Sequence, residues 1–515
     1  MMRLSSDLRN AVLHSVILVL AGVAPLSGAR AAIVISSDAT TNMSCSGETC
    51  TATASNAVLN VRKVKNLLAQ GATTVATGTA TDDLVVAAAI SWANGNSLTL
   101  YAQRNIAIDR PVSDAGTGPI RLIYDAAGAG GSLSFGDKGS ISFLGLATRL
   151  TINDLDFTLV GDIKTLAAKV RGNPSGNYAL ANRFDATNDG TYAKPPIGPR
   201  FSGRFEGLGN AISNLHVESG GNAALFAEAT AAAILTNIRV TTATIDGFTV
   251  VGGVAALNQG TMSGNSFSGK VTLTGSVGDC GFVGGLVGIN DGTIGFSHTD
   301  GAVDSTAKGL NCVEAGGLVG LSGQNNDAFV DHSYSVSTVS AAHAFDTNAG
   351  GLVGFASSPG GTSTVAYSFA AGPVTVKGSS TGPTLVGGLV GENHAAVSRS
   401  WANGAATGHD GAYVGGLLGG NFGPVDSSDG YGPVSGGVNC WCGGALGANQ
   451  GVVSNSASFG TVIGGAGSDI GGFVGVDATP GDMSWDGWDM TTSGITNPSQ
   501  GAGNIKNDPG ITGFN

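Results

Sequence analysis

The phrase GGLVG occurs four times, at residues 284–288, 316–320, 350–354 and 387–391. Looser copies begin at Gly252 (GGVAA), Gly415 (GGLLG), Gly443 (GGALG) and Gly471 (GGFVG). Successive first glycines are 32, 32, 34, 37, 28, 28 and 28 residues apart. Self-similarity at such a period is typical of repeat architectures, in which one unit cannot bury its apolar side chains alone. The phrase therefore predicts a stack of similar coils.

Other positions recur with the phrase. The sixth residue after the first glycine is an asparagine in five copies: Asn258, Asn290, Asn393, Asn421 and Asn449. Ser322 and Ala356 replace it in two copies, whose turns we expect to be looser, and Asp477 replaces it in the last. A serine-rich patch, a second glycine and a valine follow in most copies. The unit therefore reads as three short strands joined by three turns.

Stacked coils would pair each strand in parallel with its equivalent in the next coil, at about 4.8 Å per coil. The leucines of the phrase would then form an inward ladder: Leu286, Leu318, Leu352, Leu389 and Leu417. The corner asparagines would form a second ladder, because side-chain amides can hydrogen-bond along a stack. Glycine suits the corners because it accepts close backbone approach. Insertions such as residues 357–364 would leave the stack as loops.

The combination of GGLVGxN, an Ile/Val strand, a serine patch and G-x-V resembles the GLUG repeat of bacterial surface and secreted proteins. The resemblance covers residues 252–476 and implies an all-β, right-handed parallel β-helix outside a bacterial cell. We assign residues 203–476 to this GLUG-repeat β-helix. Residues 173–182, 196–198 and 201–215 resemble the lead-in that precedes such arrays in large adhesin-like proteins.

The flanking segments are assigned from local patterns. Residues 1–31 read as a signal peptide, with Arg3 and Arg9, an apolar run and small residues near Ala31; a retained anchor is the alternative. Residues 32–164 predict a β-helix segment with an N-terminal capping helix at residues 60–70. Within this segment, residues 90–100, 106–108 and 111–112 resemble coils of filamentous-haemagglutinin-like exoproteins. Residues 165–202 are expected to be a connector, helical and then irregular, and residues 477–515 a C-terminal cap with Trp485 and Trp488 over apolar edges.

The six cysteines form three close pairs. Cys45 and Cys50 bracket a turn. Cys280 and Cys312 each precede a first glycine by four residues, so stacking would place them one above the other within disulfide range. A bridge between Cys440 and Cys442 would be strained, and this pair stays open. A zinc site is the alternative for the pairs, but their spacings match no usual ligand set.

Composition limits the classes of function. Of 515 residues 85 are glycine, 12% are charged, and the net charge is −12. This charge argues against nucleic-acid binding, since no basic stripe is available to contact phosphates. No motif predicts a cofactor, a metal site or catalytic residues; calcium at Asp-Gly turns stays open. No span of a membrane is expected after removal of the signal.

Two functions remain. The first is a non-catalytic, exported adhesin-like protein at the surface of a Gram-negative-type bacterium, binding a glycan or protein on host or bacterial surfaces, with an outer-membrane secretion partner possible. The second is a secreted β-helix enzyme acting on polysaccharides, a lyase or glycosidase. An enzyme would need acidic or basic side chains from adjacent coils to converge on one concave face. Charge is sparse in the repeats, which favours the adhesin.

Overall fold

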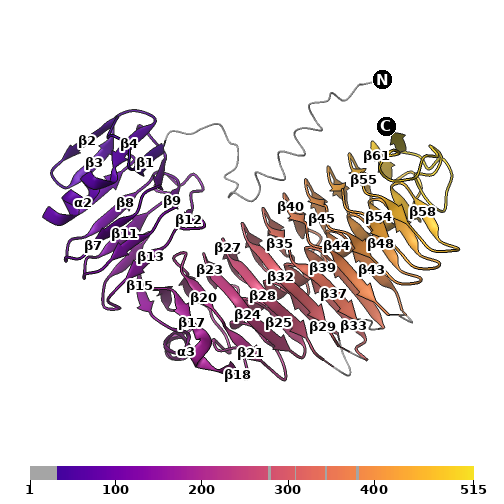
Figure 1. Cartoon of the computed structure of the whole chain (residues 1–515), viewed down its shortest axis with the longest axis horizontal. Helices are drawn as coiled ribbons and strands as arrows, with labels where there is room; N and C mark the ends of the chain where they lie inside the picture. The colour runs from indigo at the N-terminus through magenta and orange to yellow at the C-terminus, as the bar shows by residue number, and fades with distance from the viewer. Residues whose placement is uncertain (1–31, 276–279, 308, 343–344, 379–381) are drawn as a thin grey trace. The chain divides into compact units, whose positions relative to one another are not determined.

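The computed structural model describes residues 32–275, 280–307, 309–342, 345–378 and 382–515. The predicted signal peptide lies outside these ranges. The chain divides into two compact units: unit 1 is Met1–Leu159 with Leu208–Asn210, and unit 2 is Val160–Gly207 with Ala211–Asn515. Both units consist mainly of short strands, and in unit 2 the strands follow one another as rungs of a stack (Figure 1).

The repeated phrase of unit 2 builds two neighbouring parallel sheets. Sheet I holds the strands that end on the first glycine: β25 (Val250–Gly252), β29 (Gly281–Gly284), β33 (Cys312–Gly316), β38 (Asp346–Gly350), β43 (Thr384–Gly387), β48 (Tyr413–Gly415), β53 (Trp441–Gly443) and β58 (Asp469–Gly471). Sheet II holds the strands that follow: β22 (Phe226–Ala229), β26 (Ala255–Asn258), β30 (Val287–Asn290), β34 (Val319–Ser322), β39 (Val353–Ala356), β44 (Val390–Asn393), β49 (Leu418–Asn421), β54 (Leu446–Asn449) and β59 (Val474–Asp477).

Two more parallel sheets complete each coil. Sheet III contains β16 (Asn177–Leu180), β19 (Arg204–Glu206), β23 (Ile234–Thr236), β27 (Thr261–Ser263), β31 (Thr293–Gly295), β35 (Phe329–Asp331), β40 (Thr364–Ala366), β45 (Ala396–Ser398), β50 (Val425–Asp426), β55 (Val453–Ser454) and β60 (Met483–Ser484). Sheet IV contains β17 (Phe184–Asp185), β18 (Thr191–Tyr192), β20 (Ala211–Ser213), β21 (His216–Glu218), β24 (Arg239–Gly247), β28 (Ser266–Leu273), β32 (His298–Ser305), β36 (Tyr334–Ser335), β37 (Thr338–Ala342), β41 (Phe369–Ala370), β42 (Val374–Lys377), β46 (Trp401–Ala402), β47 (Ala406–Thr407), β51 (Asp429–Gly430), β52 (Val434–Ser435), β56 (Ala457–Ser458), β57 (Val462–Ile463), β61 (Asp486–Asp489) and β62 (Ile511–Phe514).

The prediction of an all-β parallel β-helix is confirmed, with one correction to the unit. Each coil has four sides rather than three, because the residues before the first glycine form the separate strand of sheet I. First glycines pair with one another from coil to coil, as in Gly284 with Gly316 and Gly316 with Gly350. The register of the phrase is therefore preserved across the 34- and 37-residue copies, and the extra residues leave the stack elsewhere.

The leucines of the phrase form an inward ladder at the corner between sheets I and II. Leu286, Leu318, Leu352, Leu389 and Leu417 are all fully buried. Each backbone N–H of the first four donates to the carbonyl of the next leucine, at 2.8–2.9 Å. Every coil thus places an apolar side chain on the same core position and hydrogen-bonds the backbone there.

Glycine is required at this corner by close backbone packing. A Cβ on Gly284 would overlap the carbonyl oxygen of Val287 in its own coil and the backbone nitrogen of Gly320 in the next. A Cβ on Gly316 would meet the equivalent atoms of Val319 and Gly354. Because these contacts are with backbone, no side-chain movement could relieve them.

The expected connector is a coil of unit 2, which corrects the prediction. Helix α3 (Ile163–Gly172) begins at Asp162, whose carboxylate accepts from the Thr165 N–H at 2.6 Å, and buries Ile163, Leu166 and Val170. A 3-10 turn, η1, covers Ala186–Asp189. The rest is not irregular, because β16, β17 and β18 pair with β19, β20 and β21 of the following coil. Buried Tyr178 and Leu180 explain why the segment joins the core.

Unit 1 repeats the coil principle with shorter sheets. One parallel sheet contains β4 (Ala57–Asn60), β1 (Ala32–Ser36), β6 (Asp83–Val86), β9 (Ile106–Ile108) and β12 (Leu133–Phe135). A second contains β7 (Ile90–Trp92), β10 (Val112–Asp114) and β13 (Ile141–Phe143). A third face contains the β2 (Met43–Ser46) and β3 (Thr49–Ala52) hairpin, then β5 (Thr73–Ala76), β8 (Leu98–Tyr101), β11 (Ile120–Ile123), β14 (Leu150–Ile152) and antiparallel β15 (Leu155–Val160).

The predicted N-terminal helix is present as α2 (Val61–Gln70). The Asn60 side chain caps it by accepting from the Arg62 N–H at 2.9 Å, and Val64 and Leu68 are buried. The helix contacts β7, the end strand of its sheet, and the Leu68 carbonyl accepts from the side chains of Asn94 and Asn96 at 2.9 and 2.8 Å. The helix therefore covers a sheet end that would otherwise leave backbone groups without partners.

We predict that Leu352→Ala destabilises unit 2 by about 2–5 kcal/mol, because the fully buried side chain lies between equivalent leucines and its removal leaves a cavity. Denaturant unfolding followed by circular dichroism measures the change. Val452→Ala is the control in the same unit, since Val452 is 56% exposed, and it should shift stability by less than about 0.5 kcal/mol. Equal effects of the two substitutions would contradict a leucine ladder in the core.

Candidate functional site

The predicted corner asparagines lie at the ends of the sheet II strands and hydrogen-bond along the stack. Nδ2 of Asn258 donates to Oδ1 of Asn290 at 2.7 Å, and Nδ2 of Asn393 donates to Oδ1 of Asn421 at 2.9 Å. The series continues from Asn421 to Asn449 at 2.9 Å and to Asp477 at 3.3 Å. All five asparagines are buried. Their hydrogen bonds hold neighbouring coils together, and because the side chains are buried no ligand can reach them.

The asparagine series is interrupted where the sequence departs from the pattern. Asn290 reaches the Ser322 hydroxyl at 3.4 Å, the longest of the side-chain contacts along this corner, and Ala356 offers no polar atom. Ala356 is nevertheless 1% exposed, and its backbone pairs with Ser322 and Asn393. The coils therefore remain stacked here with fewer side-chain hydrogen bonds.

The three cysteine pairs are disulfides in the structure. The Cα atoms of Cys45 and Cys50 are 4.0 Å apart across the β2–β3 hairpin. Those of Cys280 and Cys312 are 4.4 Å apart in neighbouring coils.

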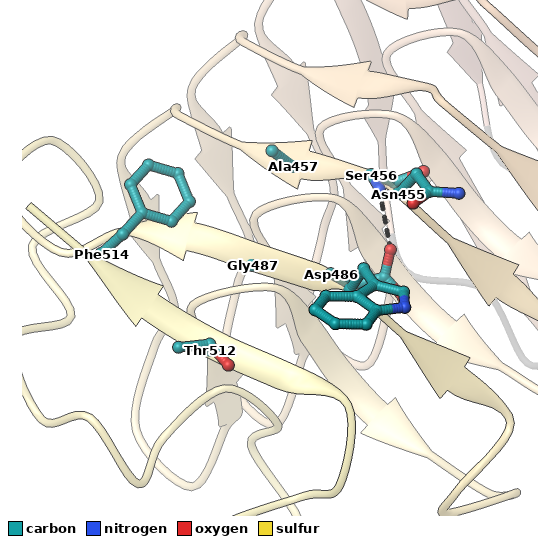
Figure 2. Close-up of a pocket in the computed structure, with 8 residues that line it drawn as sticks. Asn455, Ser456, Ala457, Asp486, Gly487, Thr512 and Phe514 are labelled. Atoms are coloured by element: carbon teal, nitrogen blue, oxygen red, sulfur yellow. Dashed lines mark hydrogen bonds between the residues drawn. The ribbon is translucent and has the colours of Figure 1, made fainter. Parts of the chain in front are cut away.

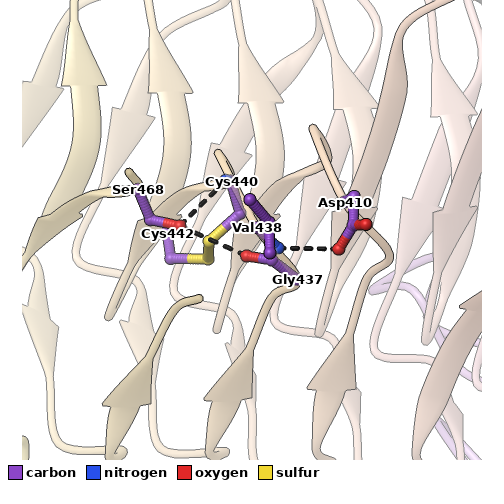
Figure 3. The surroundings of a disulfide bond; sticks show 6 residues. All are labelled: Asp410, Gly437, Val438, Cys440, Cys442 and Ser468. Carbon is purple, nitrogen blue, oxygen red and sulfur yellow. Dashed lines mark hydrogen bonds between the residues drawn. A yellow bond between two sulfur atoms is a disulfide. The ribbon is translucent and has the colours of Figure 1, made fainter. Parts of the chain in front are cut away.

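The Cys440–Cys442 pair, with Cα atoms 5.8 Å apart, lies beside a hydrogen-bonded turn (Figure 3). The Ser468 hydroxyl accepts from the Cys440 N–H at 3.0 Å and donates to the Gly437 carbonyl at 3.2 Å. Among the described residues no group of three or more His, Cys, Asp or Glu side chains is placed to hold a metal ion.

A second ladder, which the sequence analysis did not identify, runs along the corner between sheets III and IV. In six successive coils a buried serine hydroxyl accepts a hydrogen bond from a backbone N–H of the coil before, at 3.1–3.2 Å. The serines are Ser297, Ser333, Ser368, Ser400, Ser428 and Ser456. Asp486 takes the place of serine in the next coil and accepts from the Ser456 N–H at 2.8 Å.

The residue before each of these positions forms an outward row, which we call row A: Phe296, His332, Tyr367, Arg399, Ser427, Asn455 and Trp485. All seven have φ between 45° and 62°, a region that costs a non-glycine residue free energy. The Phe296 and His332 rings stack at 5.0 Å, and His332 and Tyr367 at 4.8 Å. Arg399 lies 5.2 Å from the centre of the Tyr367 ring. Left-handed corners thus present side chains outward in register.

The residue after each serine forms row B: His298, Tyr334, Phe369, Trp401, Asp429, Ala457 and Gly487. Its first four rings stack at 4.8, 4.7 and 4.4 Å with interplanar angles of 7° or less. Rings stacked in this way use their faces on one another and leave their edges to solvent. Rows A and B together form an aromatic surface in which neighbouring rings of a row cover one another's faces.

Row B loses its rings in the last coils, and a pocket of about 470 Å³ opens there (Figure 2). Asn455 and Asp486 lie on one side and Phe514 on the other, with Ala457, Gly487 and Thr512 between them. Trp485, which precedes Asp486 in the chain, also lines the pocket. Trp485 is 88% exposed, which corrects the expectation that it covers an apolar edge. Trp488 is fully buried, and its Nε1 donates to the Ile495 carbonyl at 3.0 Å.

An acidic cluster lies where sheet I faces sheet II. Glu314 on β33 pairs in register with Asn348 on β38, and Asn348 Nδ2 donates to Oε2 of Glu392 on β44 at 2.9 Å. His394 Nε2 lies 2.8 Å from Oε1 of Glu392. Burial raises the pKa of Glu314 to about 8, and the nearby charges of Glu392 and Asp346 act in the same direction. Glu314 is 5% exposed, so it is closed to a polymeric substrate.

Comparison with known proteins gives little. No protein-family model matches the sequence, and no curated protein matches it. One solved structure, described as a "putative immunoglobulin A1 protease" from Bacteroides ovatus, is 15% identical and covers 50% of this chain and 77% of its own, with a TM-score of 0.35. A likeness at this level carries neither an activity nor a ligand to this chain.

We predict that Asn421→Ala destabilises unit 2 by about 2–4 kcal/mol, because it leaves the buried Asn393 amide without its acceptor and Asn449 without its donor. Asn421→Ser, which copies the residue found at Ser322, should cost less because it keeps a polar atom. Thermal and denaturant unfolding compare the two variants. A serine variant as unstable as the alanine variant would contradict a contribution of the ladder.

The raised pKa of Glu314 predicts a pH dependence of stability. The folded-state value of about 8 lies above the ordinary 4.5, so the stability that protonated Glu314 contributes is complete below about pH 4.5. It is lost as the pH rises through about 8, by on the order of a few kcal/mol. Glu314→Gln should flatten this fall, measured as the free energy of unfolding across the interval. The control Glu218→Gln, at an exposed position, should keep the wild-type slope.

Proposed function

We propose that the chain is an exported, adhesin-like binding protein that attaches through the outward side of unit 2 to ligands on a host or bacterial surface. The observation that carries the proposal is the pair of in-register outward rows A and B. A rigid stack repeats one surface at every coil, which suits recognition by many similar contacts. The resemblance to GLUG-repeat and haemagglutinin-like proteins supports the same proposal.

Export and an outer-membrane secretion partner belong to this proposal. Three disulfides within the described chain support an oxidising environment. No helix among the described residues has the length and apolarity needed to cross a membrane. The aromatic surface itself favours a partner with apolar as well as polar groups, because ring edges are amphipathic contacts.

One observation favours the second candidate, a polysaccharide-active enzyme. Glu314, Asp346 and Glu392 come from three adjacent coils and gather between sheets I and II. Paired carboxylates are the usual groups for glycoside hydrolysis. Against this, Glu314 is almost fully buried and Glu392 is held by Asn348 and His394. We therefore propose binding as the first candidate function and polysaccharide catalysis as the second.

We expect the chain from residue 32 onward, produced with its disulfides and labelled with a fluorophore, to bind cultured epithelial cells or whole bacteria saturably. Flow cytometry measures binding, and excess unlabelled protein should displace the label. The heat-unfolded, reduced chain is the control and should bind without saturation. Absence of saturable binding to both kinds of cell would overturn the proposal. Release of new reducing ends from plant or bacterial polysaccharides, abolished by Glu392→Gln, would instead support the enzyme.

A further inference from the structure

The pocket at the last coils exists because row B runs out of side chains. The row passes from Trp401 to Asp429, Ala457 and Gly487, and Thr512 pairs with Gly487 in the next strand. Earlier coils fill the same position with stacked rings. We call the resulting space the end slot. Its volume is about 470 Å³, and it is an open hollow in the surface rather than an enclosed cavity.

One wall of the end slot is an indole with an uncovered face. Asp486 pairs with Ile511, so the position after Trp485 in row A is Gly510. Gly510 has no side chain to stack on Trp485, whereas rings earlier in the row have a neighbour on the following coil. Trp485 is also 88% exposed and adopts φ 62°. A large apolar side chain is thus held in a costly backbone conformation with its ring open to solvent.

The opposite wall is Phe514, fixed by a neighbouring ring. Its centroid lies 5.7 Å from that of Phe459 in an edge-to-face arrangement. Figure 2 shows Phe514 on one side of Ala457 and Gly487, with Asn455 and Asp486 on the other. The small residues Ala457 and Gly487 form the floor between the two walls, so the aromatic side chains of the slot are not one continuous hydrophobic patch.

The polar groups of the end slot are neutral on the side that a ligand can reach. Asn455 is fixed by donating from Nδ2 to Oδ1 of Asp426 at 2.9 Å, and Thr512 is exposed. The Asp486 carboxylate is turned to the backbone, accepting from the N–H groups of Ser456 and Ser484 at 2.8 and 3.0 Å. A cationic ligand would need a carboxylate that is not already bonded, and an anionic one would need a basic side chain; the lining offers neither.

We infer that the end slot binds one neutral sugar ring of a surface glycan, an inference that rests on the proposed attachment function. A pyranose has a face of C–H groups, which packs on the electron-rich face of the Trp485 indole, and a rim of hydroxyls. The Asn455 amide and the Thr512 hydroxyl are placed to hydrogen-bond that rim. The end slot thereby offers a free aromatic face on Trp485. The stacked rings of rows A and B offer no such face where they cover one another.

The test uses an array of neutral, sialylated and sulfated oligosaccharides, with the chain from residue 32 onward as the probe. We expect binding to neutral structures, weakened at least about tenfold by Trp485→Ala, since loss of one stacked aromatic contact and its buried area accounts for such a factor. Ala457→Tyr, which restores a row B ring, should block the slot and abolish binding with Trp485 still present. Phe296→Ala is the matched control at the far end of row A and should bind as wild type.

A second readout separates a binding role of Trp485 from a structural one. Titration with the best neutral oligosaccharide should change the tryptophan fluorescence of the wild type and of Phe296→Ala, and leave Trp485→Ala unchanged, with equal thermal unfolding of all three. Binding to sialylated or sulfated structures alone, or wild-type binding by Ala457→Tyr, would overturn the inference. Saturable attachment to cells without any neutral-sugar binding would overturn it too, and would leave the attachment proposal standing.

Discussion

Backbone-to-backbone contact at the glycine corner is the constraint on which the structure depends. At Gly284 and Gly316 the space that a Cβ would occupy is taken by a carbonyl of the same coil and an amide nitrogen of the next. Such contact fixes the distance between sheets I and II and the height of each coil together. Once these corners are set, the strands of a coil lie over their equivalents in the next coil, and inserted residues leave the stack as loops.

The same register produces the ladders inside and the rows outside. Inside, identical side chains meet identical neighbours, so leucines pack on leucines, and asparagine amides and serine hydroxyls bond along the stack. Outside, the register stacks any ring on the ring of the next coil, as it does for Tyr334 and Phe369. The stabilising ladders inside and the rows outside therefore both follow from the register between coils, and a change in coil height would disturb both.

The sequence alone predicts those features that lie at a constant distance from the first glycine. The leucines, the corner asparagines and the Cys280–Cys312 pair all lie within a few residues of it, and insertions do not displace them. Insertions shift rows A and B in the copies that begin at Gly316, Gly350 and Gly471, so counting forward from the first glycine does not find them in every copy. Counting back from the second glycine finds them: Trp401 and Phe369 each precede a glycine, Gly404 and Gly372, by three residues. The sequence therefore does mark these rows, by their distance from the second glycine of the repeat.

Other features depend on packing that no spacing reveals. Glu314 occupies an outward strand position, which in an isolated sheet would face water. It is buried because sheet II closes over it, and this closure follows from the sharp glycine corner. The strands of residues 177–192 were hidden for a related reason, since they carry no repeat phrase and become strands only by pairing with the next coil.

Regular stacking also limits where a ligand can bind. A ring between two stacked rings has no free face, so a continuous ladder offers a ligand ring edges and no face on which to stack. Row B loses its rings after Trp401, where Asp429, Ala457 and Gly487 follow. In row A, Gly510 follows Trp485, so no side chain of the next strand covers the indole. The left-handed corner holds Trp485 outward at that point, although no neighbouring ring in the row stacks on it to offset the cost of this backbone conformation. The regular rows therefore offer a partner many ring edges, and the break in the pattern adds the one kind of contact they lack between stacked rings, a free aromatic face.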